Sequence, residues 1–301
     1  RHQVLRLGTS DHVLASTLHH VAFDGASAGV LLRELTALHA AFRDGRPSPL
    51  PELPVQYADF CLWQRRRLEE ETGRRQLDAW CQALRGVPPV LDLPADRPRP
   101  QVPTHRGATA AGRLSEPATE ALERLAASRR ASLFMVLLTG FAVWLARTTG
   151  RTDLVVGSPG GHRDRPELEG LIGFFVQTLP LRIDASGDPS FEALLDRVRT
   201  AVVEAMGRQD VPLERIVDAL GIERDLRHAP LVQAMVGDDK VRSIMLFMEG
   251  VRDGAAFRRA IKATVGGRPT PLRNEPAFEE AVESFVQECP GDSSIRRTLE
   301  S

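Results

Sequence analysis

Two adjacent histidines, His19 and His20, precede Asp24 and Gly25 in the stretch LHHVAFDGAS. Imidazole ionises at a pH of about 6.5, so a histidine that faces a cleft can act as a general base toward an amine or a hydroxyl. A carboxylate just before a helix, such as that of Asp24, more plausibly binds backbone donors or forms an ion pair. Gly25 permits a tight turn or the close approach of a substrate. The spacing fits either a catalytic histidine or a structural pair at a strand end.

Two other kinds of site are disfavoured. A metal site would use His12, His19, His20 and Asp24 as donors. Adjacent residues of a strand face opposite sides, however, and do not easily share one ion. A Ser/His/Asp hydrolase would require a nucleophile elbow between a strand and a helix, and we expect none in this chain.

The elements around the histidines follow from local patterns. Residues 3–8 and 12–20 read as strands joined by turn-forming side chains, and this pair delivers His19 and His20 to a strand end. A helix is expected from Ser27, because apolar residues recur at intervals of three or four. They are Leu32, Leu35, Leu38 and Phe42.

The remaining chain alternates helical and strand patterns. A helical stretch is expected over about 55–85, followed by a proline-rich connector. Ser115, Ser132 and Ser190 stand where they can cap helices, and Gly221 closes a short one. Residues 152–159 and 174–183 read as strands. This alternation predicts an α/β sandwich in two layers.

The composition excludes several classes of partner. The 39 basic and 40 acidic residues are interspersed and give a net charge of −1, so we expect neither a nucleic acid nor a membrane surface as partner. The most apolar stretch, residues 132–146, is too short to cross a bilayer. The 3 cysteines are far apart, and no export signal is evident. A reducing, cytoplasmic location is expected.

The LHHVAFDG stretch resembles the HHxxxDG motif of the condensation domains of nonribosomal peptide synthetases, which belong to the chloramphenicol-acetyltransferase-like superfamily. Further stretches follow in the order that this family uses. They are YADFCLW (57–63), IGFFVQTLPLR (172–182), RQDVPLERI (208–216) and RDLRHAPL (224–231). The resemblance covers roughly residues 3–236.

The resemblance implies an incomplete, two-lobed α/β condensation domain and an acyltransferase activity. An acyl or aminoacyl donor, held as a thioester on one carrier protein, would react with an aminoacyl amine on another to form an amide. The partners implied are donor and acceptor peptidyl carrier proteins and adjacent synthetase modules. No tightly bound cofactor and no metal are implied, because the phosphopantetheine arms belong to the carriers.

The resemblance also assigns roles to residues. His20 matches the active-site histidine, whether it takes the amine proton or mainly positions the amine, and His19 and Asp24 complete the motif. Asp24 would be structural, and Arg182 is a candidate ion-pair partner for it. Substrate-binding candidates are Gly25, Ser158 and Gln177. Structural candidates, besides Arg182, are Tyr57, Trp63, Asp210 and Arg224.

The chain also departs from the family pattern. Only about 18 residues precede the histidines, where the family has a long N-terminal stretch, and Ala26 stands where many members have tryptophan. We expect a partial N-terminal lobe at 1–110, a partial C-terminal lobe at 111–236 and a divergent tail at 237–301. The tail reads as a strand and a helix, and is weakly similar to nucleoside-diphosphate-forming acyl-CoA synthetases.

Two alternatives to condensation remain at this point. An epimerisation domain uses the same motif and inverts a carrier-bound residue, although the later motifs look more like the condensing branch. A truncated, noncatalytic remnant would at most bind carrier protein. Its exposed apolar surface would favour oligomers.

Overall fold

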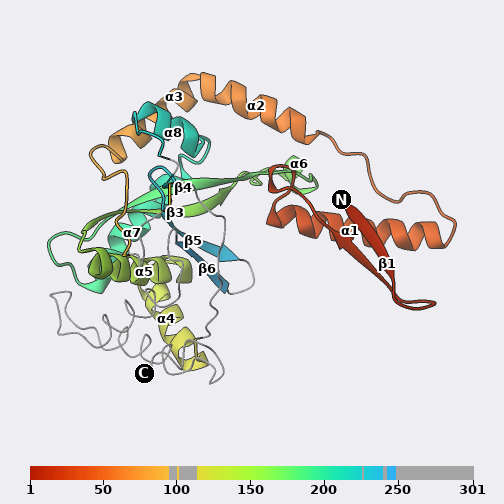
Figure 1. Cartoon of the computed structure of the whole chain (residues 1–301), viewed down its shortest axis with the longest axis horizontal. Helices are drawn as coiled ribbons and strands as arrows, with labels where there is room; N and C mark the ends of the chain where they lie inside the picture. The colour runs from red at the N-terminus through yellow and green to blue at the C-terminus, as the bar shows by residue number, and fades with distance from the viewer. Residues whose placement is uncertain (95–99, 102–113, 226, 240–242, 249–301) are drawn as a thin grey trace. The chain divides into compact units, whose positions relative to one another are not determined.

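The computed structural model describes residues 1–94, 100–101, 114–225, 227–239 and 243–248 (Figure 1). These residues form two compact units. Unit 1 contains Arg1–Arg75 and Gly160–Gln177, and unit 2 contains Gln76–Pro159 and the described residues from Thr178 onward. Two expectations fall outside the described residues, namely the lobe boundary at 110 and the helix in the tail. The weak similarity of the tail stays a prediction. A segment distant in sequence, 160–177, thus joins the unit that carries the two histidines.

Unit 1 begins with a hairpin and a long helix. Strand β1 (His2–Arg6) pairs antiparallel with β2 (His12–Ser16), which confirms the expected pair of strands, although β2 ends at Ser16 rather than at the two histidines. A short 3-10 helix η1 (His20–Ala22) precedes α1 (Gly25–Arg43). The unit also contains α2 (Tyr57–Glu69) and α6 (Pro166–Glu169). The helical stretch expected at 55–85 is two helices, because Glu70 is extended between α2 and α3 (Glu71–Ala83).

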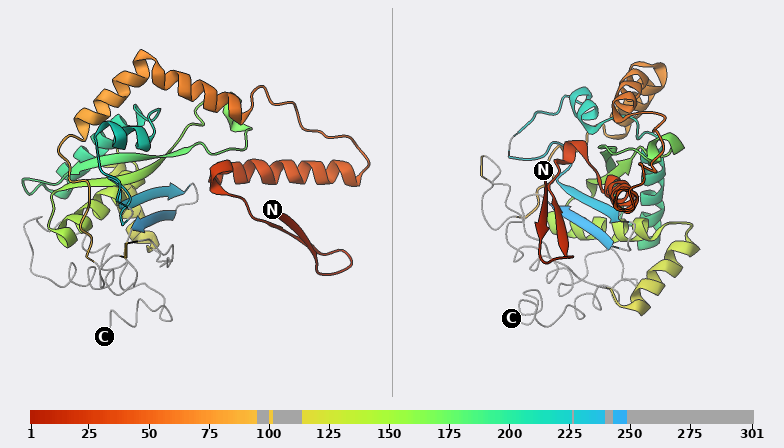
Figure 2. Two further views of the ribbon diagram at one scale, coloured as in Figure 1. Left: turned by 45° about the horizontal axis from the view of Figure 1, so that its top comes forward. Right: turned by 90° about the vertical axis from the view of Figure 1, so that its right-hand side faces the viewer.

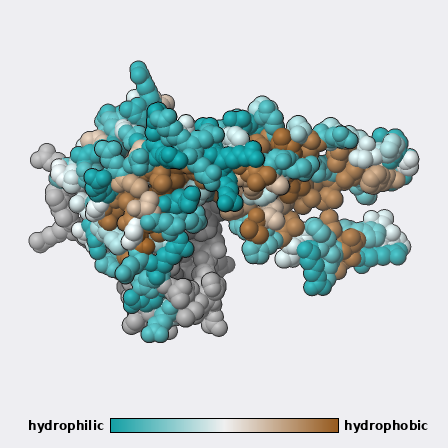
Figure 3. Space-filling model, turned by 90° about the horizontal axis from the view of Figure 1, so that it is seen from above, coloured by the Kyte–Doolittle hydropathy of each residue, from teal (hydrophilic) through white to brown (hydrophobic). Residues whose placement is uncertain are grey.

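Several apolar residues of unit 1 are exposed. The helix predicted from Ser27 is present, but the apolar residues that predict it do not form a buried face, since Leu32 and Phe42 are 68% and 60% exposed. Ser27, Val30 and Ala41 are buried instead. Both faces of the β1–β2 hairpin are exposed as well. Figure 3 accordingly shows hydrophobic residues at the surface in the region of α1 and the hairpin.

Unit 2 is built on a mixed sheet with the strand order β4-β3-β5-β6. These strands are β3 (Asp153–Gly161), β4 (Val176–Asp184), β5 (Ala234–Asp239) and β6 (Ser243–Met248). β3 pairs parallel with β5, and β5 pairs antiparallel with β6. Figure 2 shows β5 and β6 side by side from two further directions. The strands expected at 152–159 and 174–183 are confirmed.

Three helices of unit 2 begin where the sequence predicts, and a fourth ends just before Gly221, which was expected to close a short helix. They are α4 (Glu116–Ser128), α5 (Leu133–Thr149), α7 (Phe191–Met206) and α8 (Leu213–Ala219). Ser115, Ser132 and Ser190 cap the first three by accepting a backbone N–H, as expected. Helix α5 packs against α4 and α7. It buries residues on all sides, which explains its continuous apolar sequence.

Among the described residues, no single helix combines the length and apolarity needed to cross a bilayer. Only α4 and α5 together pass by length and composition, and they are bent by 103° at their junction.

Candidate active site

The two histidines of the motif differ in their hydrogen bonds. His19 is the N-cap of η1, and its Nδ1 accepts the Val21 N–H at 3.1 Å. His20 Nδ1 lies 2.7 Å from the Phe23 carbonyl oxygen, which only accepts hydrogen bonds, so this nitrogen carries a proton and donates it. In neutral His20 the Nε2 then presents a lone pair. His20 is exposed, and it is the histidine equipped to accept a proton.

Asp24 is the N-cap of α1 and is 2% exposed. Its Oδ1 accepts hydrogen bonds from the Ser27 N–H, the Ser27 hydroxyl and the Arg163 guanidinium. Its Oδ2 accepts the Phe175 N–H at 3.1 Å. Burial by itself raises the pKa of Asp24, but the Ser27 and Phe175 hydrogen bonds and the Arg163 charge outweigh it and hold the pKa below its ordinary value. Asp24 is therefore an ionised anchor for the loop.

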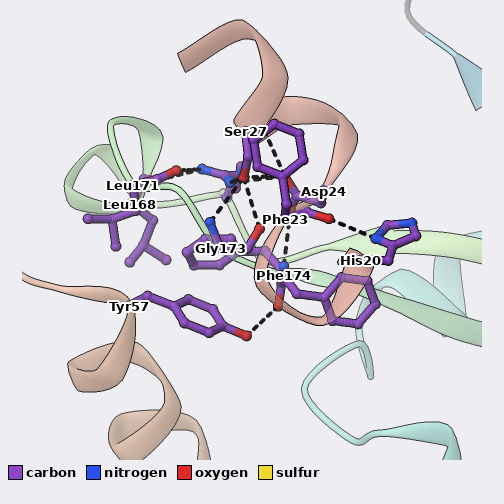
Figure 4. A network of polar contacts seen from close by, with 11 residues as sticks. His20, Phe23, Asp24, Ser27, Tyr57, Leu168, Leu171, Gly173 and Phe174 are labelled. Carbon is purple, nitrogen blue, oxygen red and sulfur yellow. Dashed lines mark hydrogen bonds and ion pairs between the residues drawn. The ribbon is translucent and has the colours of Figure 1, made fainter. Parts of the chain in front are cut away.

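Segment 173–175 lies against the start of α1 (Figure 4). The Asp24 N–H donates to the Gly173 carbonyl, and the Gly173 N–H donates to the Ser27 hydroxyl oxygen. Ser27 is 0% exposed, so these polar groups are satisfied by one another. The contacts join residues separated by about 146 positions in the chain. They fix the loop that carries His20.

Arg163 completes this network, and the sequence pattern did not single it out. Its guanidinium lies 3.1 Å from Asp24 and donates to the carbonyls of Leu168 and Leu171. It also lies over the Phe175 ring, 4.1 Å from the centroid. The side chains of Arg163 and Asp24 are 15% and 1% exposed, so the ion pair is largely shielded from water. Arg163 stands in the polar stretch HRDR, and nothing in that stretch indicates that its side chain is buried.

The expected pairing of Asp24 with Arg182 is wrong. Arg182 binds Asp153 through two parallel hydrogen bonds of 2.9 and 2.8 Å. It also donates to the Ala83 and Arg85 carbonyls. Asp24 belongs to unit 1 and Arg182 to unit 2, and each pairs within its own unit.

A cluster of aromatic side chains supports segment 173–175 from its other side. Tyr57 donates its hydroxyl proton to the Phe174 carbonyl at 2.8 Å. Burial, with the neighbouring Cys61 thiol, raises the pKa of Tyr57 to about 12, so this hydroxyl stays protonated. Phe60 and Phe175 are buried with Leu168 and Leu171, and Tyr57 and Trp63 pack against them. Trp63 lies beneath the guanidinium groups of Arg67 and Arg165.

The three substrate-binding candidates lie in different surroundings. Gly25 opens α1, and no atom lies within 4 Å of the place where a Cβ would project. Gln177 lies in unit 1, and its side-chain nitrogen is 2.8 Å from Nε2 of the buried His162. Ser158 is 8% exposed on β3 and belongs to unit 2. The structure thus brings His20, Gly25 and Gln177 into one unit and leaves Ser158 in the other.

The remaining structural candidates make polar contacts within unit 2. Asp210 accepts a hydrogen bond from Gln76 at 2.9 Å, and the nearby Arg208 carbonyl accepts the indole N–H of Trp80. Arg224 pairs with Asp218 at 2.8 Å on an exposed surface. These contacts connect loops to helices of the same unit.

The structure bears on both disfavoured kinds of site. The sequence pattern of a nucleophile elbow, GxSxG, is present as GASAG at 25–29. Ser27 nevertheless lies inside the first turn of α1, fully buried, rather than exposed on an elbow between strand and helix. Within the described residues, no group of three or more His, Cys, Asp or Glu side chains is arranged to hold a metal ion.

Comparison with known proteins identifies relatives over most of the chain. The family model described as condensation domain matches residues 1–238. Phosphinothricin tripeptide synthetase PhsC of Streptomyces viridochromogenes is 49% identical over 78% of this chain. Malpinin synthetase of Mortierella alpina is 40% identical over 78%. The matches span 22% and 3% of those relatives, so the chain corresponds to a small part of their length.

Solved structures support the same grouping. The X-domain from teicoplanin biosynthesis has a TM-score of 0.80 at 25% identity, over 95% of this chain and 72% of that one. The condensation domain of the monacolin K polyketide synthase MokA shares the fold, with a TM-score of 0.68 at 18% identity over 95% and 72% of the two chains. The mixed α/β architecture is that of the chloramphenicol-acetyltransferase-like fold. This chain belongs to the condensation-domain family of nonribosomal peptide synthetases.

Proposed function

We propose that this chain forms an amide bond between a carrier-bound acyl or aminoacyl thioester and a carrier-bound aminoacyl amine. Support comes from the family match over residues 1–238 and from the similarity to a tripeptide synthetase. The observation that carries the proposal is the hydrogen bond from His20 Nδ1 to the Phe23 carbonyl, because it leaves Nε2 able to accept a proton.

In the proposed reaction, the acceptor amine donates a hydrogen bond to His20 Nε2 and attacks the thioester carbonyl carbon. A carbon–nitrogen bond forms and the carbon–sulfur bond breaks. The amine proton passes to His20 and then to the departing sulfur, so the donor arm leaves as a thiol. A neutral amine is already nucleophilic. Holding it at the distance and angle needed to attack the carbonyl carbon supplies much of the rate acceleration.

The other motif residues take supporting roles in this proposal. Asp24 keeps the loop in place, His19 caps η1, and Gly25 leaves open space for substrate at the start of α1. Gln177 and Ser158 are retained as candidate substrate contacts. The phosphopantetheine arms arrive on donor and acceptor carrier proteins in adjacent synthetase modules. We place the reaction in the cytoplasm, where such thiols stay reduced.

Mass spectrometry of an acceptor carrier loaded with an amino acid tests the proposal. The carrier is mixed with this chain and a donor-loaded carrier, over a broad panel of donors and acceptors. A mass gain of one donor residue is expected, and His20→Ala should abolish it. His39→Ala is the matched control, because His39 is an exposed histidine on α1 and the product should persist.

Two results would contradict the proposal. One is equal product formation by His20→Ala and the parent chain. The other is no product across the panel while a longer relative is active in parallel, which would favour a noncatalytic carrier-binding role. Inverted chirality of the donor residue without amide formation would indicate an epimerase.

A further inference from the structure

The orientation of the His20 ring depends on contacts at two places. One is the hydrogen bond from Nδ1 to the Phe23 carbonyl. The other is Phe174, whose ring centroid lies 5.1 Å from that of His20 at an interplanar angle of 81°. This edge-to-face geometry is favourable for aromatic rings. Figure 4 shows both neighbours beside the imidazole. A single hydrogen bond permits rotation about its axis, whereas the second contact restricts it.

The backbone of Phe174 is itself held firmly. Tyr57 donates to its carbonyl, and the N–H of the next residue, Phe175, donates to Asp24. Phe175 is 2% exposed in the aromatic cluster, while Phe174 is half-buried beside His20. The polar network around Asp24 therefore fixes the segment, and Phe174 extends that order to the imidazole.

Gly173 makes this arrangement possible. A Cβ at position 173 would lie 2.3 Å from the Tyr57 ring, far inside van der Waals contact. Tyr57 could not then lie across the segment and reach the Phe174 carbonyl. The hydrogen bond from Tyr57 to the Phe174 carbonyl therefore requires glycine at position 173.

We propose that Phe174 is a positioning residue for His20, held in place by Tyr57 and restricting the imidazole to the orientation in which Nδ1 donates to Phe23. The proposal rests on the proposed function, in which His20 Nε2 faces the acceptor amine. It predicts that loss of the Phe174 ring disorders His20 without unfolding the loop, because Asp24 and Phe175 still anchor the segment.

Nuclear magnetic resonance of the chain with isotope-labelled histidine tests the contact directly. Phe174→Leu should change the ring-proton shifts of His20, assigned by their loss in His20→Ala, because the ring current of Phe174 disappears. The nitrogen shifts should show a less populated Nδ1–H form. Phe42→Leu is the matched control, since Phe42 is 60% exposed on α1, and His20 should not respond. Phe174→Tyr keeps a ring and should restore the parent spectrum.

Tyr57→Phe provides a second, milder variant. It keeps the ring against Gly173 and removes only the hydroxyl that binds the Phe174 carbonyl. The His20 signals should move in the same direction as in Phe174→Leu, by a smaller amount. Unchanged His20 signals in Phe174→Leu, with circular dichroism equal to the parent, would overturn the proposal.

Kinetics separates this proposal from the proposed function. In the carrier assay, Phe174→Leu should lower kcat by about three- to tenfold with little change in KM, the range expected from losing one aromatic pair. Phe174→Tyr should recover most of kcat. If His20→Ala keeps full activity, the proposed function fails. The histidine resonance shifts would still show whether Phe174 orients the His20 ring. An unchanged kcat in Phe174→Leu, with His20→Ala inactive, would refute positioning.

Discussion

Two arginine–aspartate pairs, one in each unit, show how burial and geometry contribute differently to an ion pair. Arg182 and Asp153 have the better geometry, with two parallel hydrogen bonds, yet both side chains are 34% exposed. Arg163 and Asp24 share one contact of 3.1 Å and are 15% and 1% exposed. Water can replace the partner in the first pair but hardly in the second. The pair with the less favourable geometry should therefore be the costlier to break.

The largest effect is expected for Arg163→Met. The substitution keeps an apolar stem and leaves the Asp24 carboxylate buried without its positive partner. Removing one member of a buried pair costs about 3–5 kcal/mol. Hydrogen exchange measured by mass spectrometry should show faster exchange in α1, which Asp24 caps, and no change in β3. Protection of α1 equal to that of the parent chain would contradict the assignment of Arg163 as anchor.

A smaller effect is expected for Arg182→Met. The variant loses the hydrogen bonds that Arg182 donates to Asp153 and to two backbone carbonyls. Because Asp153 can recruit water instead, we expect a cost of about 1.5–3 kcal/mol, the range for hydrogen bonds to charged groups. Exchange in β3 and β4 should accelerate, whereas exchange in α1 should not. The comparison of the two pairs fails if this variant loses more protection than Arg163→Met does.

Protonation of Asp24 should weaken the Arg163–Asp24 pair without deleting it. The pKa of Asp24 is lower in the folded protein than its ordinary value of about 4, so its contribution is present above that value. The contribution is lost as the pH falls through the folded pKa. Exchange protection of α1 should decrease in this acid range, and the decrease should be smaller in Asp24→Asn, which has no carboxylate to protonate. An identical acid profile for the variant would show that other groups control the loop.

The smallest effect is expected for Arg224→Ala. Arg224 and Asp218 lie 2.8 Å apart, as close as the Arg182 pair, but their side chains are 63% and 60% exposed. Exposed pairs contribute about 0.2–1 kcal/mol. Exchange in α8 should change little, and addition of salt should remove the difference from the parent chain. A cost comparable to that of Arg163→Met would show that distance, rather than burial, ranks the three pairs.

The parts of the fold that were predictable have local signals. Ser115, Ser132 and Ser190 mark helix starts because a capping side chain and its backbone donor are three residues apart. The patterns that predict the strands and the HHxxxDG motif are equally local signals. The buried face of α1 was not predictable, because Leu32 and Phe42 have the spacing of a core face and are nevertheless exposed.

The candidate site shows the same limit. His20 and Asp24 were evident from a single short motif, whereas Arg163 meets Asp24 across 139 positions. In the sequence Arg182 is an equally suitable partner for Asp24, since any arginine near a motif can pair with a carboxylate. Only the fold determines that 160–177 joins unit 1 and that β4 carries Arg182 in unit 2. Partner choice between like side chains is a tertiary property that the sequence pattern does not encode locally.

Tyr57 has a consequence for spectroscopy, because it is the only tyrosine among the 301 residues. Any tyrosinate absorbance of the chain therefore reports on the hydroxyl that binds the Phe174 carbonyl. An exposed tyrosine ionises at a pH of about 10, while this one should ionise near a pKa of about 12 while the segment remains bound. The protonated Tyr57 hydroxyl stabilises the folded chain fully below the ordinary tyrosine pKa. This stabilisation is lost as the pH rises through the folded pKa. Ultraviolet titration of unlabelled protein thus follows the docking of one three-residue segment beside His20.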